Sequence, residues 1–172
     1  MHNKVVFHAM KALNGFGFPV LRFNFRGAGL SEGKHDEGRG EVEDAKTALH
    51  WLEERFHLPV VFAGFSFGAA TGLRAACPDP HVDALIALGM PVRVDDRSYG
   101  FKFLSECTKP KLLLSGGHDQ FGPRHELGRL VARLPEPKKL VIIEDADHFF
   151  SGHLAEMRRA IEEWVRNTVS SF

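Results

Sequence analysis

The sequence predicts an α/β protein in which a mostly parallel sheet is flanked by helices. Short apolar runs alternate with longer stretches of helical apolar spacing from one end of the 172-residue chain to the other. The short runs are apolar throughout, which is typical of parallel strands buried on both faces. The length suits one domain with a sizeable core, so we expect residues 1–172 to form a single domain.

The composition narrows the range of partners and compartments. Lys and Arg together number 22, as do Asp and Glu. This balance of charge argues against binding to nucleic acid or to a charged membrane surface. No apolar run approaches the ~20 residues of a membrane span, and residues 1–6 do not resemble a signal peptide. Cys77 and Cys107 form no spaced framework, so we expect unpaired, buried cysteines and a cytoplasmic location.

The first third of the chain contains two predicted helices and one predicted strand. Apolar residues at helical spacing predict a helix over 2–14, and a second helix over 41–56. The aromatic and aliphatic run 18–25 predicts a strand between them. A glycine-rich loop over 26–33 follows that strand and continues as a polar segment up to the second helix.

The rest of the chain alternates strands with helices, as a parallel sheet requires. The apolar runs and the helical patterns give the following order: strand 60–63, helix 68–76, strand 82–88, a connection over 89–110 with a short helix near 101–106, strand 111–115, helix 124–134, strand 139–143 and helix 153–168. The connection 89–110 is too short to fold into a separate cap domain.

A sharp turn with a serine at its apex lies between the strand at 60–63 and the helix at 68–76. Gly64-Phe65-Ser66-Phe67-Gly68 has the G-x-S-x-G pattern of a nucleophile elbow. Such a turn strains the backbone of the serine and brings its neighbours close, so glycines on both sides remove Cβ atoms that would collide. Ser66 would then stand at the carboxyl end of a strand, beside the free N–H groups of the new helix.

Two further polar residues follow strands at the same edge of the predicted sheet. Asp119 comes after the strand at 111–115, and His148 comes after the strand at 139–143. A neutral imidazole can take the serine proton near neutral pH, and a carboxylate fixes the tautomer of that imidazole. We therefore expect Ser66 to be a nucleophile, His148 its base and Asp119 the orienting acid, with the Phe67 amide as an oxyanion donor.

Other polar residues have simpler interpretations. Asp95 or Asp96, after the third strand of the predicted sheet, is an alternative acid, while Asp145 and Asp147 lie too close to His148 and fit turn or capping roles. The glycine loop does not match a nucleotide-binding pattern. We expect Arg26 to fix that loop through carbonyl or carboxylate contacts rather than to bind substrate. The scattered histidines lack metal-ligand spacing, and we expect no metal and no cofactor.

The glycine-rich loop reads Asn24-Phe25-Arg26-Gly27-Ala28-Gly29-Leu30-Ser31-Glu32-Gly33. Together with Gly64–Gly68, Gly117-His118-Asp119 and 146–150, it resembles the small, lid-less bacterial hydrolases of the α/β-hydrolase superfamily that carry an N-F-R-G-x-G-x-S-x-G loop. The resemblance covers nearly the whole chain. It implies an α/β-hydrolase fold and carboxylesterase-type hydrolysis, with relatives that are often labelled peptidase-like.

The chain departs from that family at its start. The resemblance implies three strands before the first helix, one of them between the segments here at 18–25 and 60–63, and a second oxyanion donor after it. Either the chain is shortened, or a second copy replaces the missing strands, or 18–25 pairs directly with 60–63. The sequence favours the first of these, with weakened activity from the lost donor.

These observations predict a serine hydrolase that cleaves short-chain carboxylic esters through an acyl-enzyme. The same triad would also serve a peptidase or amidase, and a hydrolase scaffold without its first strands could instead be a binding module. A small-molecule ester is the expected partner, without nucleic acid or membrane. An edge exposed by absent strands leaves room for a homodimer. Phe65, Phe67, Phe121 and Phe149 lie near the predicted site and could line an acyl pocket.

Overall fold

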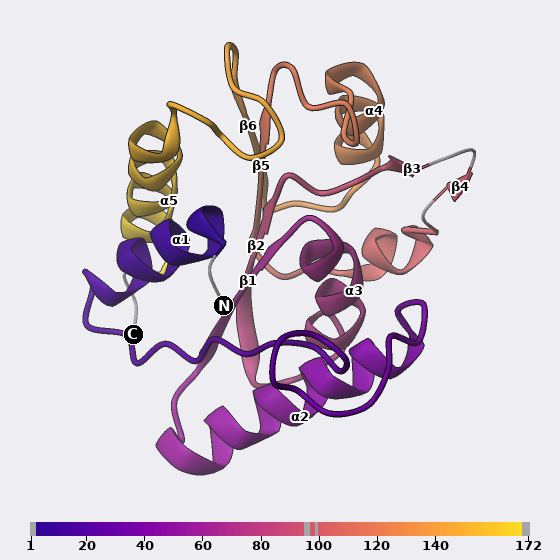
Figure 1. Cartoon of the computed structure of the whole chain (residues 1–172). Helices are drawn as coiled ribbons and strands as arrows, with labels where there is room; N and C mark the ends of the chain where they lie inside the picture. The colour runs from indigo at the N-terminus through magenta and orange to yellow at the C-terminus, as the bar shows by residue number, and fades with distance from the viewer. Residues whose placement is uncertain (1–2, 95–96, 99, 170–172) are drawn as a thin grey trace.

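A four-stranded parallel sheet forms the centre of the computed structural model, which describes residues 3–94, 97–98 and 100–169 (Figure 1). The order of the strands in the sheet is β1-β2-β5-β6, and each neighbouring pair is parallel. The strands are β1 (Val60–Phe65), β2 (Val82–Leu88), β5 (Lys111–Gly116) and β6 (Lys138–Ile143). Their carboxyl ends therefore meet at one edge of the molecule, where polar side chains can gather.

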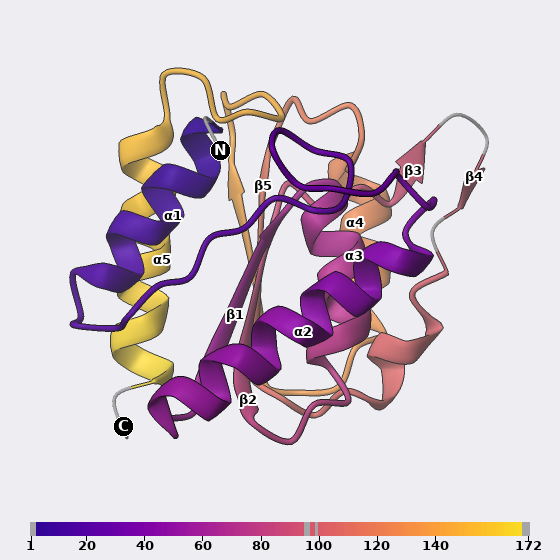
Figure 2. The same cartoon turned by 60° about the horizontal axis from the view of Figure 1, so that its bottom comes forward.

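Helices cover both faces of this sheet, as Figures 1 and 2 show. On one face lie α1 (Lys4–Asn14) and α5 (Leu154–Thr168), which pack against each other. On the other face lie α2 (Arg39–Phe56), α3 (Phe67–Ala76) and α4 (Arg124–Ala132). The mostly parallel α/β architecture predicted from the sequence is confirmed.

Each face of the sheet has its own hydrophobic core, because side chains alternate between the faces of a strand. In β2, Ile86 and Leu88 pack toward α1 and α5, whereas Leu85 and Ala87 pack toward α3 and α4. All four of these side chains are buried. A strand that is buried on both faces is a nearly continuous apolar run, without alternating polar residues, and the sequence of this strand has that pattern.

The predicted helices and strands after residue 38 are all present, with shifts only at their ends. The connection 89–110 contains a two-stranded antiparallel ribbon of β3 (Arg93–Val94) and β4 (Arg97–Ser98), and the 3-10 helix η1 (Lys102–Glu106). The ribbon was not predicted from the sequence. It is too short to carry a periodic apolar pattern, and it holds no residue of the main sheet.

The prediction of a strand over 18–25 is wrong. The structure describes this whole segment and assigns no strand to it, and β1 pairs only with β2 in the described sheet. The segment instead passes the β1 edge from α1 toward the loop before α2 (Figures 1 and 2). Phe18 packs with the α1–α5 core and Phe25 with the α2–α3 core, so crossing the edge partly buries these two side chains without a partner strand. Direct pairing of 18–25 with 60–63 is thereby excluded.

The expectation that both cysteines are unpaired is also wrong. Cys77 and Cys107 form a disulfide, with their Cα atoms 5.8 Å apart. Cys77 is the capping residue directly after α3, and Cys107 is the capping residue directly after η1. The bond thus ties the helix that follows Ser66 to the connection before β5. Two cysteines separated by 30 positions give no sequence signal of such proximity.

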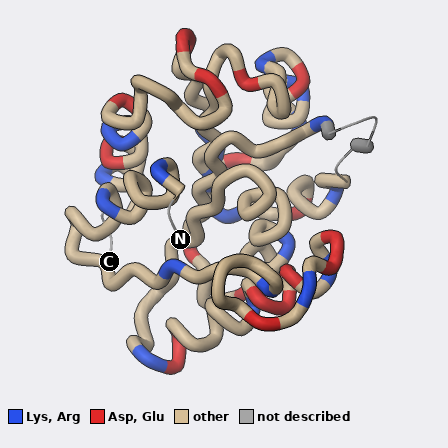
Figure 3. Tube along the Cα trace, viewed as in Figure 1, with Lys and Arg blue, Asp and Glu red and all other residues tan. Residues whose placement is uncertain are grey.

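Charged residues of both signs are distributed along the described chain (Figure 3). Lys and Arg residues are interspersed with Asp and Glu residues on the same elements, for example in the ion pairs Lys46–Glu43 within α2 and Arg158–Glu162 within α5. In the described part of the chain, no helix combines the length and the apolar character needed to cross a bilayer.

Candidate functional site

The turn between β1 and α3 holds Ser66 in a strained backbone conformation. Its φ of 53° and ψ of −123° lie in a region of backbone conformation that residues other than glycine rarely adopt. The Ser66 amide donates to the Leu88 carbonyl at 2.9 Å, which ties the apex to the end of β2. The Ser66 carbonyl accepts from the amides of Ala69 and Ala70, so α3 starts directly behind the serine.

Gly64 is the position that makes this turn possible. A Cβ atom at Gly64 would lie 2.7 Å from the Ala69 Cα atom and from the Gly68 carbonyl oxygen, both of which are backbone atoms that cannot yield. At Gly68 an added Cβ would meet only the Phe25 ring, at 3.7 Å. The sequence reasoning placed the steric demand on both glycines, and the structure places it on Gly64.

His148 follows β6 and reaches Ser66 across the end of the sheet. Its Nε2 atom lies 2.9 Å from Ser66 Oγ. The turn that carries His148 crosses the end of β5, where a Cβ on Gly116 would lie 2.3 Å from the Ala146 carbonyl oxygen. At the end of β2, Gly89 has a φ of +50°, and a Cβ there would be 3.3 Å from the His148 ring. Glycine at these strand ends therefore leaves room for the histidine.

Asp147 shapes the same turn, as its position in the sequence suggested. Its Oδ1 atom accepts hydrogen bonds from the amides of Phe149 and Ser151, each at 2.9 Å. The backbone hydrogen bond from Ser151 is the largest influence that lowers the pKa of Asp147. The turn role predicted for this residue is confirmed.

Asp119 lies on the far side of the histidine from the serine. Its Oδ2 atom is 2.9 Å from His148 Nδ1, and its Oδ1 atom accepts from the amides of Phe121 and Gly122 at 2.9 and 3.2 Å. The side chain is buried, and burial alone would raise its pKa. The hydrogen bond and the charge interaction with His148, together with the two amides, outweigh burial and lower the pKa of Asp119.

The three predicted site residues thus form one continuous line of hydrogen bonds, Ser66–His148–Asp119. An ionised Asp119 accepts from the Nδ1–H group, which leaves Nε2 free to accept the proton of the serine hydroxyl. Phe67 is the first residue of α3, and amides in the first turn of a helix have no acceptor within that helix. The alternative acids Asp95 and Asp96 lie outside the described residues.

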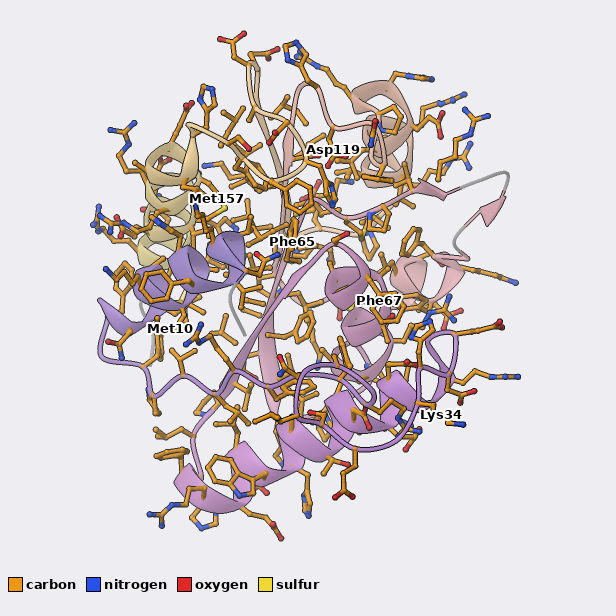
Figure 4. The ribbon with its side chains drawn as sticks, viewed as in Figure 1. Met10, Lys34, Phe65, Phe67, Asp119 and Met157 are labelled. Atoms are coloured by element: carbon orange, nitrogen blue, oxygen red, sulfur yellow. A yellow bond between two sulfur atoms is a disulfide. The ribbon has the colours of Figure 1, made fainter. Side chains whose placement is uncertain are left out.

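Three phenylalanine rings surround the imidazole of His148. The centroids of Phe65, Phe121 and Phe149 lie 5.0, 4.7 and 5.1 Å from its centroid. Figure 4 shows Phe65 on the same side of the molecule as Asp119, at the carboxyl ends of the strands. The Phe149 side chain is 55% exposed, so this aromatic group is open to solvent on one side.

Phe67 has a different environment from the other three aromatic residues. Its ring packs against the rings of Phe25 and His35, with centroid distances of 5.7 and 5.4 Å. It therefore contacts the glycine-rich loop rather than His148, and Figure 4 shows it at the start of α3. Of the four residues expected to line an acyl pocket, Phe65, Phe121 and Phe149 contact the histidine.

Arg26 anchors the glycine-rich loop, as the sequence suggested. Its guanidinium forms two-pronged hydrogen bonds with the Asp44 carboxylate, the shortest of them 2.7 Å. The Arg26 side chain is the main cause of the lowered pKa of Asp44. Gly40 lies directly beneath the guanidinium, where a Cβ atom would come within 2.0 Å of Arg26 Nη1.

The sequence profile of a family described as "Alpha/beta hydrolase domain" matches residues 1–170. The chain belongs to this alpha/beta hydrolase family. A protein of Rickettsia prowazekii without an assigned function is 36% identical to it over the whole of this chain and 75% of the relative. A Mycobacterium tuberculosis relative is 29% identical, and the aligned part spans 80% of this chain and only 55% of the relative.

Solved structures support the same family. A structure from Coxiella burnetii described as an alpha-beta serine hydrolase homologue has a TM-score of 0.86 and 35% identity, and it covers 95% of this chain and 76% of its own. A structure from Xanthomonas campestris described as a serine hydrolase without lid has a TM-score of 0.85 and 32% identity. The match covers 97% of this chain and 74% of the Xanthomonas chain. The recognition made from the loop and the elbow is therefore confirmed at the level of the family.

Sequence reasoning missed three residues that shape this candidate site. Gly89 makes room for His148, Ser115 contacts Asp119, and Glu41 organises the loop beside Phe67. Gly89 directly follows β2, and Ser115 lies near the end of β5. Both positions are at the carboxyl edge of the sheet, where ligands bind, and this could have singled them out. Glu41 has no such signal, because a glutamate in the first turn of a helix is ordinary.

A groove elsewhere on the molecule has no part in this site. A groove of about 690 Å³ lies between α4 and β6 and is lined by Arg124, His125, Gly128, Leu140, Ile142 and Glu144, none of which belongs to the hydrogen-bonded line. Among the residues that the structure describes, no group of three or more His, Cys, Asp or Glu side chains is arranged to hold a metal ion.

Proposed function

We propose that this hydrolase cleaves short-chain carboxylic esters through an acyl-enzyme, with Ser66 as nucleophile, His148 as base and Asp119 as orienting acid. The observation that carries the proposal is the line of two 2.9 Å contacts that joins Ser66 Oγ, the two ring nitrogens of His148 and Asp119 Oδ2. A serine, an imidazole and a carboxylate in this arrangement have the geometry of acyl transfer.

In the first half of the reaction, Ser66 Oγ attacks the ester carbonyl carbon while His148 Nε2 takes the hydroxyl proton. The tetrahedral oxyanion receives a hydrogen bond from the Phe67 amide at the start of α3. The ester C–O bond then breaks, and His148 gives the proton to the departing alcohol. Asp119 remains ionised and stabilises the imidazolium, which its lowered pKa favours.

In the second half, water replaces the alcohol. His148 Nε2 takes a proton from the water as its oxygen attacks the acyl carbon, and the second oxyanion again lies against the Phe67 amide. The bond between the acyl carbon and Ser66 Oγ breaks, and His148 returns the proton to the serine. The products are a carboxylic acid and the free enzyme, and the chemistry needs no cofactor or metal.

The proposed preference for short acyl chains rests on the open surroundings of the serine. Phe149, beside His148, is 55% exposed, and the connection 89–110 contributes only the short ribbon and η1 in its described part. A site that is open to solvent offers little enclosed apolar surface with which to bind a long acyl chain. We therefore expect no interfacial activation either.

A panel of p-nitrophenyl esters from acetate to palmitate tests this proposal, with an aminoacyl-proline anilide as the amide substrate. We expect the highest kcat/KM on acetate or butyrate, little hydrolysis of the anilide, and loss of both activities in Ser66→Ala. Activity that rises from octanoate to palmitate would contradict the chain-length preference. Hydrolysis of the anilide in preference to butyrate would identify a peptidase or amidase instead.

The partner and the compartment remain proposals. A small-molecule ester fits an open site, and a homodimer through the β1 edge stays a prediction that light scattering can test. The cytoplasmic location was inferred from cysteines expected to be unpaired, and the Cys77–Cys107 disulfide removes that support, since such bonds are uncommon in the cytosol.

A further inference from the structure

Ser115 contacts the Asp119 carboxylate inside the protein. It lies near the end of β5, four positions before Asp119, and its side chain is fully buried. Its Oγ atom is 3.2 Å from Asp119 Oδ2, the same oxygen that faces His148 Nδ1. The proposed acyl-transfer steps do not use this hydroxyl.

The direction of this hydrogen bond follows from the ionisation of Asp119. An ionised carboxylate has only acceptors, so the Ser115 hydroxyl must be the donor. Asp119 Oδ1 already accepts from the amides of Phe121 and Gly122. Ser115 and His148 supply the two donors to Oδ2, so that each oxygen of the carboxylate accepts two hydrogen bonds.

Ser115 lies on an inner strand of the sheet. β5 is flanked by β2 on one side and by β6 on the other, and Ser115 is in register with Ile142 of β6. Asp119 itself lies on a loop after β5. The torsion that rotates an aspartate carboxylate is broad. The Phe121 and Gly122 amides that hold Oδ1 belong to this same loop, so Ser115 is the donor that ties the carboxylate to a strand of the sheet.

We propose that Ser115 is a positioning residue, whose hydroxyl fixes the plane of the Asp119 carboxylate and thereby aims Oδ2 at Nδ1 of His148. The inference rests on the proposed function and deepens it. Because Ser115 is buried and acts through Asp119 and His148, it has no contact with a substrate bound at Ser66. Its loss should therefore slow the chemical steps and leave substrate binding unchanged.

The test compares Ser115→Ala with the wild type in ester hydrolysis and in the rate of labelling by a fluorophosphonate, which reacts with an activated serine. We expect kcat on p-nitrophenyl butyrate and the labelling rate each to fall about tenfold, with KM within about twofold of the wild type, as the loss of a hydrogen bond to a charged group implies. Ser105→Ala is the matched control, because its hydroxyl donates to the Lys102 carbonyl on the exposed η1. This control should leave kcat, KM and the labelling rate unchanged.

Equal kcat and equal labelling in Ser115→Ala and the wild type would overturn the inference while leaving the proposed function intact. A change in KM as large as the change in kcat would also overturn it, since that result indicates a general disturbance of the site. Failure of the wild type itself to hydrolyse esters and to be labelled would instead overturn the proposed function. The melting temperature of each variant shows whether it is folded.

Discussion

His148 Nε2 lies 2.9 Å from Ser66 Oγ, although 82 positions separate the two residues in the chain. Ser66 follows β1 and His148 follows β6, and these strands form opposite edges of the described sheet. The contact therefore spans the carboxyl ends of β2 and β5. Gly89 and Gly116 leave the space through which the His148 turn passes. The candidate site is thus a product of the strand order and of glycines at the strand ends.

We predict that Gly64→Ala destroys the elbow. The added methyl group would lie 2.7 Å from backbone atoms of α3, and relief requires moving the helix that positions Ser66. We expect a loss of several kcal/mol in the free energy of unfolding, measured by urea denaturation, or failure to fold.

Gly128→Ala is the matched control for this prediction. Gly128 lies inside α4, and an added Cβ meets nothing within 4 Å there. Alanine should stabilise the helix by about 0.5–1 kcal/mol. The steric account of the elbow fails if the two substitutions change the free energy of unfolding by similar amounts.

The strands that form the sheet were largely predictable from the sequence, because a parallel strand buried on both faces is an unbroken apolar run. Val82–Leu88 was predicted at its observed bounds. The segment 18–25 is also rich in apolar residues but has no partner strand in the described structure. Strand formation depends on a neighbour that can accept hydrogen bonds, and local sequence carries no information about that neighbour.

The positions of Ser66, Asp119 and His148 at the carboxyl edge of the sheet were also predictable, because each follows an apolar run. Their mutual distances and the hydroxyl of Ser115 depend on strand order and register, which a single sequence does not reveal. The Cys77–Cys107 disulfide escaped prediction for the same reason. Proximity between distant positions is a property of the fold rather than of their spacing.

Glu41 should stabilise the loop before α2 in a pH-dependent manner. Its fully buried carboxylate accepts from the amides of Asp36 and Gly38 at 2.8 and 2.9 Å, and lies 2.7 Å from His35 Nδ1. Burial alone would raise the pKa of Glu41, but these backbone hydrogen bonds and the histidine lower it below the ordinary value of 4.5. The ionised carboxylate therefore stabilises the fold above about pH 4.5, and this contribution is lost as the pH falls below that value.

We predict that Glu41→Gln lowers the free energy of unfolding at neutral pH by about 1–3 kcal/mol, since glutamine removes the buried charge and replaces one of the two acceptor oxygens with an NH2 donor. The difference from the wild type should shrink as the pH is lowered below 4.5. Glu43→Gln, an exposed member of the same helix that pairs with Lys46, should change the free energy by less than about 0.5 kcal/mol. A difference for Glu41→Gln that stays constant from neutral to acid pH would refute the role of its charge.

The Cys77–Cys107 disulfide should contribute measurably to stability. It closes a loop with a sequence separation of 30, and the loss of chain entropy in the unfolded state favours the fold by about 3.6 kcal/mol. Urea unfolding of the oxidised protein should therefore require more denaturant than unfolding of the reduced protein. The double variant Cys77→Ala, Cys107→Ala should not respond to reductant. Two titratable thiols in the unreduced, denatured protein would show that the bond is not formed.

The central claim is that Ser66 is activated by His148 and Asp119, and covalent labelling tests it most directly. A fluorophosphonate probe reacts with an activated serine and leaves a mass increase that can be assigned to a peptide. We predict that the wild type and Ser105→Ala are labelled on the peptide that contains Ser66, and that Ser66→Ala is not labelled. A wild-type protein that remains unlabelled, or a Ser66→Ala variant labelled as the wild type is, would contradict the account.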